Sequence, residues 1–455
     1  MIPNFALHFN HNLLSYKITC ILLYNYSIIF GNLRGKTVLD IKSLGEVVRE
    51  IAGLKGVISF WNAQVRLDEF LEVRGEASAR RTEFIGEKVL QPVTPQKPPP
   101  ILALDGSSRI VGTAYAFTTI AAVSLVSERF GVILDYPHLW FKYPVLLERE
   151  PPFIGVAPEA PNIKLKLPPY ATQRSPAGFL YDPDYNRSQI VDEVRTNLEN
   201  KVLKDGAIKA ALTEVFGLKH RLILVDGPLY HTPAVFMNPG VDEKYKLSWK
   251  VMVKDRVKAI RENLEHELTV VGIVKRFERS TIITRSYGYL SEVNNVLGVD
   301  VSRTGSDLAA IDTIYHYAKK KGVIGYPLRP QIIGPFLIKP SWVYIDVPNT
   351  PSKVVAYVII PKHPYLDVGY RVFRVEVPYE AYEKYENLVF EWIVGDTVYF
   401  STTLPYSLIL ADTRCKKWSA SLLLYLSRLY SEAKIPLTYE SRLMVEYVFK
   451  ELTSK

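Results

Sequence analysis

The sequence has 455 residues, of which 48% are hydrophobic and 23% are charged, so it can bury a large core and is not a wholly disordered or fibrous chain. Its formal charge of +9 permits a polyanionic partner but does not require one. The two cysteines form no CxxC pair and the scattered histidines no HExxH motif, which excludes a disulfide framework and a thiolate zinc site. Any metal site would have to be built from carboxylates, which favours Mg²⁺ or Mn²⁺.

Residues 1–35 are expected to be a poorly ordered or doubtful N-terminal segment. The stretch from Leu13 to Phe30 is about long enough to span a bilayer, but it contains Lys17 and Asn25. It lacks the basic cluster and the small-residue cleavage site of a signal peptide. We therefore expect no membrane association and a cytoplasmic protein. A P-loop-like sequence follows at residues 31–37, but it is one residue too short to close around phosphates.

Residues 36–90 are predicted to be an N-terminal helical segment, because apolar residues recur three or four positions apart from Val38 to Ile51, and a second helix is plausible near Leu67 to Phe84. Residues 91–100, QPVTPQKPPP, contain five prolines and are predicted to be a linker. The main domain is expected to span residues 101–425.

The main domain is expected to open with a strand at residues 101–104, a tight turn in the sequence GSSR and a second long strand. Residues 151–185 are proline-rich and are predicted to be an insertion or surface loop, and residues 276–340 an irregular insertion with helices. Between and after these insertions, strand and helix patterns alternate, and residues 426–455 are predicted to be a C-terminal helical segment. The alternation predicts an α/β fold, a mixed sheet with flanking helices.

Two acidic residues follow strands of the same kind. Asp105 comes after the apolar run ILAL and Asp226 after LILV, and each is followed by glycine. If the two strands are neighbours, both carboxylates emerge at one edge of the sheet, where they would repel each other unless a cation lies between them. Such a site suits hard divalent ions and a phosphate substrate. The alternative is ordinary, because Asp-Gly after a strand is also a common turn signal.

A third acidic ligand is expected from the helix predicted at residues 188–202. On a helical projection Glu199 lies at the border of the apolar face, whereas Glu193 points towards solvent, so Glu199 is the better candidate. The alternative for Glu199 is a solvated acid that contacts Arg195 one turn earlier.

Two further charged residues are candidates by position. Asp412 ends the run LPYSLILAD, where it could also be an acid near a helix N-terminus that interacts with the helix dipole. Lys275 follows the strand predicted at residues 269–274 and could meet a phosphate, or belong to a solvated basic cluster.

Taken together, these segments resemble the NurA nucleases. The motifs occur in the order seen in that family over roughly residues 100–425: DGSS at Asp105, the helical Glu199, LVDGPL at Asp226, VVGIVKR around Lys275, FRVEVP from Phe373 and LPYSLILAD ending at Asp412. The resemblance implies an RNase H-like core, and an archaeal or bacterial Mn²⁺-dependent DNA nuclease, with Mg²⁺ as a possible substitute. It implies a single-strand endonuclease and 5′ to 3′ exonuclease that acts as a homodimer with the hexameric HerA translocase in DNA end resection.

The resemblance also implies residue roles. Asp105, Glu199, Asp226 and Asp412 would hold two metal ions, with Asp412 at a position where the family often has histidine. Lys275 would be a catalytic or DNA-contacting cation, and Glu193 remains the fallback for the helical ligand. A non-catalytic DNA-binding or adaptor subunit on the same fold is the alternative function, and an RNase H-like enzyme acting on RNA hybrids is a further one.

Overall fold

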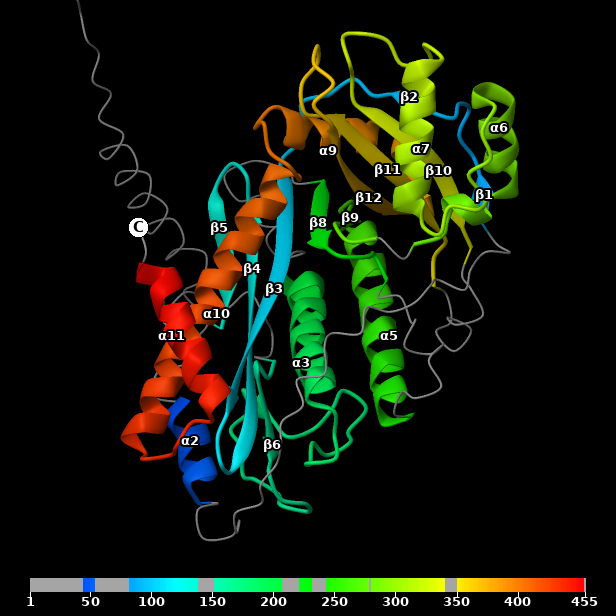
Figure 1. The fold of residues 1–455 in the computed structure, drawn as a ribbon. Coiled ribbons are helices and arrows are strands. Elements are labelled where there is room, and N and C mark those ends of the chain that lie inside the picture. The colour runs from blue at the N-terminus through cyan, green and yellow to red at the C-terminus, as the bar shows by residue number, and fades with distance from the viewer. Residues whose placement is uncertain are drawn as a thin grey trace, which may run out of the picture. The chain divides into compact units, whose positions relative to one another are not determined.

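One mixed β-sheet organises the part of the chain that the computed structural model describes, which is residues 44–53, 82–137, 151–206, 221–230, 243–277, 280–339 and 350–453 (Figure 1). Its strands follow the order β1-β10-β11-β12-β9-β8-β3-β4-β6-β7, with β2 beside β10 and β5 beside β4. The strands are β1 (Thr82–Phe84), β2 (Gln91–Pro92), β3 (Ile101–Gly112), β4 (Ala116–Ser127), β5 (Gly131–Tyr136), β6 (Ile154–Pro158), β7 (Ala171–Thr172), β8 (Leu222–Asp226), β9 (Thr269–Val274), β10 (Gln331–Ile338), β11 (Lys353–Pro361) and β12 (Tyr370–Pro378).

The helices lie between and after these strands. They are α2 (Leu44–Gly53), α3 (Arg187–Lys201), α5 (Glu243–Glu265), α6 (Tyr287–Leu297), α7 (Asp307–Lys320), α8 (Tyr379–Tyr385), α9 (Leu388–Val398), α10 (Tyr406–Glu432) and α11 (Tyr439–Thr453), with a π-helical turn η4 (Val202–Gly206) and a 3₁₀ turn η7 (Ile283–Arg285). In the described residues, no helix is long and apolar enough to cross a membrane.

Five strands in the order β6-β4-β3-β8-β9 form the centre of the sheet. β3 and β4 are an antiparallel hairpin and β6 pairs antiparallel with β4, whereas β3, β8 and β9 run parallel to one another. Parallel neighbours need crossover connections, and α5 lies in the connection from β8 to β9. This order confirms the predicted α/β fold with an RNase H-like sheet. Antiparallel strands β12, β11 and β10 extend the sheet beyond β9.

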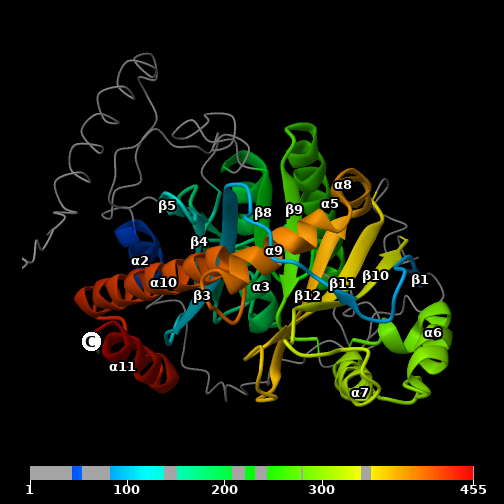
Figure 2. The same cartoon turned by 90° about the horizontal axis from the view of Figure 1, so that it is seen from above.

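The two faces of the central strands carry different helices, as Figure 2 shows from above. Because alternate residues of a strand point to opposite faces, neighbouring threonines of β4 separate the layers. Thr118 contacts the Tyr430 hydroxyl of α10 at 2.8 Å. Thr119 lies instead beside Gly155, at which an added Cβ would also meet Val194 of α3. The sheet is therefore enclosed between α10 on one face and α3 on the other.

Buried apolar side chains complete each layer. On the α10 side, Ala103 of β3 and Leu224 of β8 belong to one core cluster with Phe390 of α9 and Leu408 of α10. A second cluster packs α6 and α7 against β10 and β11. Every residue of the central strands β4 and β9 is buried, so these strands are covered on both faces, which explains why their sequences are nearly continuous apolar runs.

The structure corrects the predicted turn after Asp105. β3 continues through Gly-Ser-Ser-Arg and stays in register with β4 from Leu102 to Gly112, and the chain turns only at residues 113–115. Thr113 closes that turn, because its hydroxyl accepts the backbone N–H of Ala116 at 3.0 Å. Gly106 lies in the strand opposite Val123, and a glycine is required there because Glu199 of α3 occupies the space where a Cβ would lie. Local turn chemistry was outweighed by tertiary packing.

Both predicted insertions contain strands of the sheet. Residues 151–185 include β6, a fully buried strand paired with β4, and residues 276–340 end in β10. The helices predicted in the second insertion are present as α6 and α7. A run as short as β6, set among prolines, carries too little periodicity to indicate burial.

The structure describes only part of the N-terminal region, so it tests only some of the predictions made for residues 1–100. Residues 44–53 form α2, but the end of the second predicted helix, Thr82–Phe84, is strand β1. Residues 1–35, with the apolar stretch and the P-loop-like sequence, lie outside the described residues. In the predicted linker, residues 91–92 pair with β10, and residues 93–100 have no regular structure.

We expect Ile154→Ala to lower the free energy of unfolding by about 2–5 kcal/mol, because Ile154 is fully buried where β6 pairs with β4. Chemical denaturation followed by circular dichroism measures this loss. The exposed Lys164→Ala in the same segment should change stability by no more than about 0.5 kcal/mol. If both variants changed the free energy of unfolding by the same small amount, the segment would be a surface loop and the buried position of Ile154 would be contradicted.

Candidate metal centre

Three aspartates from distant parts of the chain meet beside the middle of β3 and the carboxyl end of β8. Asp105 of β3, Asp226 of β8 and Asp412 of α10 each offer a carboxylate oxygen, and these three oxygens lie within 4.8 Å of one another. The parallel register explains the first two, since Leu104 pairs with Val225 and the next residue of each strand is an aspartate. Asp105 shares the face of Ala103, on which α10 packs, so that α10 supplies the third carboxylate.

The acidic side chains of this cluster lie close together and are largely shielded from solvent. The Asp105 side chain is almost buried, with the residue 6% exposed, and its Oδ1 accepts the N–H of Gly106 at 2.8 Å. Burial, followed by the negative charges of Asp226 and Glu199, raises the pKa of Asp105 well above its ordinary range. A divalent cation would relieve this repulsion, and an all-oxygen donor set is what Mn²⁺ and Mg²⁺ prefer. The residues present therefore fit such an ion.

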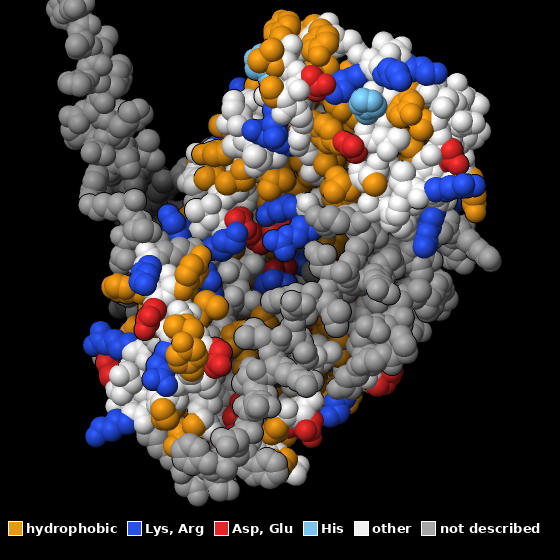
Figure 3. Space-filling model, viewed as in Figure 1, with side chains coloured by type: hydrophobic (Ala, Val, Ile, Leu, Met, Phe, Trp, Pro, Cys, Tyr) orange, Lys and Arg blue, Asp and Glu red, His pale blue; other side chains and the backbone are white. Residues whose placement is uncertain are grey.

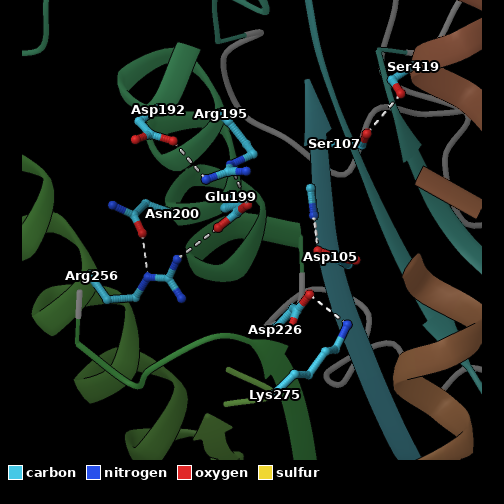
Figure 4. Close-up of polar contacts among 11 residues, drawn as sticks. Asp105, Ser107, Asp192, Arg195, Glu199, Asn200, Asp226, Arg256, Lys275 and Ser419 are labelled. Atoms are coloured by element: carbon cyan, nitrogen blue, oxygen red, sulfur yellow. Dashed lines mark hydrogen bonds and ion pairs between the residues drawn. The ribbon is translucent and has the colours of Figure 1, made fainter. Parts of the chain in front are cut away.

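Lys275 supplies a positive charge to the cluster from the residue after β9 (Figure 4). Its Nζ lies 2.8 Å from Asp226 Oδ2 and 3.8 Å from Asp412 Oδ1. Burial lowers the pKa of Lys275, but the attraction of Asp226, Asp105 and Asp412 is stronger and the net pKa is raised. Lys275 therefore remains a cation in contact with the carboxylates.

Asp412 has a second cationic neighbour on its own helix. Lys416, one turn later in α10, places Nζ 2.7 Å from Asp412 Oδ2. Burial raises the pKa of Asp412, but Lys416 and Lys275 outweigh it, so the net pKa is lowered. Near the middle of the face seen in Figure 3, acidic side chains lie in a hollow with Lys and Arg side chains around them. Asp412 is therefore a stable anion on the α10 side of the cluster.

Glu199 lies beside the three aspartates but on the α3 side of the sheet. Its Oε1 would be only 2.4 Å from a Cβ at residue 106, so the absence of a side chain at Gly106 is what lets Glu199 reach β3. Arg256 of α5 approaches Glu199 Oε2 at 3.2 Å, and Arg195 approaches Oε1 at 3.7 Å. Glu199 is thus oriented by two arginines at the border of the cluster (Figure 4). It is not one of the three residues whose oxygens lie within 4.8 Å of one another.

The structure corrects the predicted position of Glu193, which is fully buried and does not face solvent. The hydroxyl groups of Tyr181 and Tyr185 donate to its two carboxylate oxygens at 2.8 and 2.7 Å. Both tyrosines come from residues 151–185, the segment predicted to be a surface loop. Because this segment covers the outer side of α3, a second stripe of the helix is buried in addition to the apolar one.

Arg256 also belongs to this neighbourhood, although its place in a basic run with Lys250, Lys254 and Lys258 favours an exposed helix surface, and that interpretation is wrong for Arg256. It is 1% exposed, and besides Glu199 it contacts Asn200 at 2.5 Å through its Nε. A signal was present in the sequence, since Arg256 occurs four residues after Met252 and four before Ile260, in an otherwise apolar stripe. A lone arginine within a buried stripe indicates a buried acidic partner.

Comparison with known proteins gives one family and several loose structural likenesses. The family model described as the NurA domain matches residues 99–416. A crystal structure of the NurA nuclease from Sulfolobus solfataricus is 12% identical, with 89% of this chain and 90% of that chain covered and a TM-score of 0.38. A crystal structure of NurA with manganese is 11% identical, with 90% and 96% covered and a TM-score of 0.34.

A third solved structure, the catalytic domain of human endonuclease V, is 10% identical, with 82% of this chain and 95% of that chain covered and a TM-score of 0.28. Structural likenesses this loose carry no argument about activity. No curated protein matches the sequence.

The burial of Glu193 predicts a pH dependence of stability. Burial raises the pKa of Glu193 from its ordinary value of 4.5 to about 7, although the tyrosine hydroxyls oppose the shift. A carboxyl whose folded-state pKa is raised stabilises the fold at low pH and loses that contribution as the pH rises from 4.5 through 7. Above pH 7, Glu193→Gln should therefore be more stable than the parent by up to about 3 kcal/mol.

Denaturant unfolding at several pH values measures this difference, which should shrink as the pH falls towards 4.5. The exposed Asp184→Asn is the matched control and should track the parent protein at every pH. A difference for Glu193→Gln that does not change with pH would contradict the assigned shift.

Proposed function

The chain belongs to the NurA family, and from this premise we propose that it is a metal-dependent DNA nuclease that hydrolyses phosphodiester bonds. The observation that carries the proposal is the cluster of Asp105, Asp226 and Asp412. Three carboxylates that meet at low exposure are costly to the fold without a cation, and divalent ions bound by such clusters act on phosphate esters in many enzymes.

We propose that Asp105, Asp226 and Asp412 hold Mn²⁺, with Mg²⁺ as a possible substitute, and that Glu199 completes the set when two ions bind. A bound divalent ion supplies Lewis acidity towards the phosphate and lowers the pKa of a coordinated water. Asp105 is the acid on which the negative charges of Asp226, Glu199 and Asp412 all act, so it would hold an ion together with each of them. Its burial keeps bulk water from competing for the site.

Lys275 has a separate role in this proposal. In the absence of an ion its ammonium group neutralises Asp226 and Asp412. With a cation held by the carboxylates, the ammonium group of Lys275 would be free to face the phosphate and to stabilise the negative charge that develops during cleavage. Arg256 and Arg195 hold Glu199 and so keep its carboxylate from turning away from β3. Each charged residue of the neighbourhood thus either holds a cation, orients an acid or faces the substrate.

The finer activity rests on family membership alone. We propose that the protein is a single-strand endonuclease and 5′ to 3′ exonuclease, and that it acts in the cytoplasm during DNA end resection. The rival function is a DNA-binding or adaptor subunit that keeps the fold without cutting. Incubation of labelled single-stranded DNA with Mn²⁺ or with EDTA separates the two, since only a nuclease shortens the DNA in the presence of the metal.

We expect Asp226→Asn to abolish Mn²⁺-dependent cleavage, because the amide removes one negative charge from the metal-binding cluster. Circular dichroism should show the fold to be intact. Glu193→Gln is the matched control and should cleave at the parent rate, since this buried acid binds tyrosines away from the cluster. Undiminished cleavage by Asp226→Asn would refute the metal site proposed here.

Family membership also motivates two partners. We propose that the protein is a homodimer and that it binds a HerA-type hexameric ATPase. Sedimentation equilibrium of the full chain should give twice the monomer mass. Mixing with the ATPase should yield one complex on size-exclusion chromatography and faster degradation of duplex ends in the presence of ATP. A monomer that elutes separately from the ATPase would contradict both assignments.

A further inference from the structure

Glu376 of β12 is a fully buried carboxylate whose charge lies outside the three-aspartate cluster. Lys353 approaches its Oε2 at 3.0 Å and Arg374 approaches its Oε1 at 2.8 Å. Its Oε2 also accepts the backbone N–H of Leu229 at 2.9 Å. Leu229 lies only three residues after Asp226, so a carboxylate from another strand contacts the turn that begins at a proposed metal ligand.

The turn after Asp226 lies directly on the sheet because of a glycine. Gly272 of β9 pairs with Glu376 across the β9–β12 ladder. A Cβ at Gly272 would come within 2.5 Å of the Leu229 nitrogen and 2.8 Å of the Gly227 carbonyl oxygen. Gly272 thus leaves the space that the turn fills, and Glu376 reaches Leu229 at the same place.

The first residue of the turn is also constrained. Gly227 has φ of +97°, a conformation that other residues adopt only with strain, and its N–H donates to the carbonyl oxygen of Ile273 at 2.9 Å. The backbone after Asp226 is therefore held at two points, by β9 at Gly227 and by Glu376 at Leu229. These two bonds hold the backbone of the residues that directly follow Asp226.

The anchor of Glu376 extends further into the sheet. Arg374 donates to the Ser280 hydroxyl at 2.9 Å, and Ser280 donates to the buried carboxylate of Asp307, which also binds the Tyr357 hydroxyl. Two cations and two anions are thus buried together. Buried ion pairs of this kind stabilise a fold weakly or not at all compared with apolar residues of the same volume. Stability alone therefore does not account for a carboxylate at this place.

We propose that Glu376 is a positioning residue for the metal site. Its carboxylate, held by Lys353 and Arg374, fixes the turn at residues 227–229 and thereby the carboxylate of Asp226. This inference rests on the proposed function, since it assigns Glu376 to the same site. Groups that orient a metal ligand typically change metal affinity by about 10- to 100-fold when they are altered.

Two variants distinguish the effect of the length of the Glu376 side chain from the effect of its negative charge. Glu376→Asp keeps the negative charge for Lys353 and Arg374 but is one methylene too short to reach Leu229. Glu376→Gln keeps the length, and its amide oxygen can still accept the Leu229 N–H, but it removes the charge. Positioning predicts that Glu376→Asp weakens Mn²⁺ binding about 10-fold or more while Glu376→Gln stays close to the parent protein. A purely structural charge role predicts the opposite order.

The measurement is Mn²⁺ binding to the full chain without DNA, followed by the electron paramagnetic resonance signal of free Mn²⁺. Asp307→Asn, at the far end of the same buried network, is the control and should lower the unfolding midpoint without changing Mn²⁺ affinity. Parent-like binding by Glu376→Asp, or equal weakening by all three variants, would overturn the positioning role and leave the nuclease proposal standing. A parent protein that binds no Mn²⁺ would overturn both.

A second measurement on the unaltered protein covers the case in which Glu376→Asp does not fold. Hydrogen exchange resolved at the Leu229 amide should be slow, because that amide is bonded to a fully buried carboxylate. Exchange at the rate of an open turn would show that Glu376 does not hold the chain there, and the inference would fail.

Discussion

The mutual repulsion of Asp105, Asp226 and Asp412 is the constraint on which the rest of the site depends. Parallel pairing of β3 with β8 puts the first two side by side, and α10 brings the third. Such a cluster persists only if cations face it, and Lys275 and Lys416 do so from two different elements. The same repulsion is what makes the cluster a receptor for a divalent ion.

Glycines determine how closely other parts of the chain approach this cluster. Gly106 admits the carboxylate of Glu199 from the α3 side, and Gly272 admits the turn that follows Asp226. Each close approach is then held by buried charge, from Arg256 at Glu199 and from the Lys353–Arg374 pair at Glu376. Backbone space and paired charge together position the acidic side chains, which is a requirement for any chemistry on a phosphate ester.

Much of the architecture could be predicted from local sequence patterns, and the predictions that were wrong concern segments whose structure depends on tertiary packing. The apolar runs before Asp105 and Asp226, the helix containing Glu199 and the strand before Lys275 were all predictable, because each has a clear period or a continuous buried run. The turn predicted after Asp105 was wrong because Asp-Gly is compatible with both a turn and a long strand. The long pairing of β3 with β4, from Leu102 to Gly112, is a tertiary property that decides in favour of the strand.

The sequence by itself determined the chemistry of the site: carboxylates, no thiolate cage, and two aspartates that each follow a four-residue apolar run. These are local properties of the sequence. Because alternate residues of a strand point to opposite faces of a sheet, the position of each aspartate in its strand also determines the face on which its side chain lies. Tertiary structure decided which acid of α3 faces the sheet, since the burial of Glu193 depends on Tyr181 and Tyr185, which arrive from an irregular segment. It also decided the position of Glu376, because a charge in a strand is buried only when the layers on both faces of that strand are present.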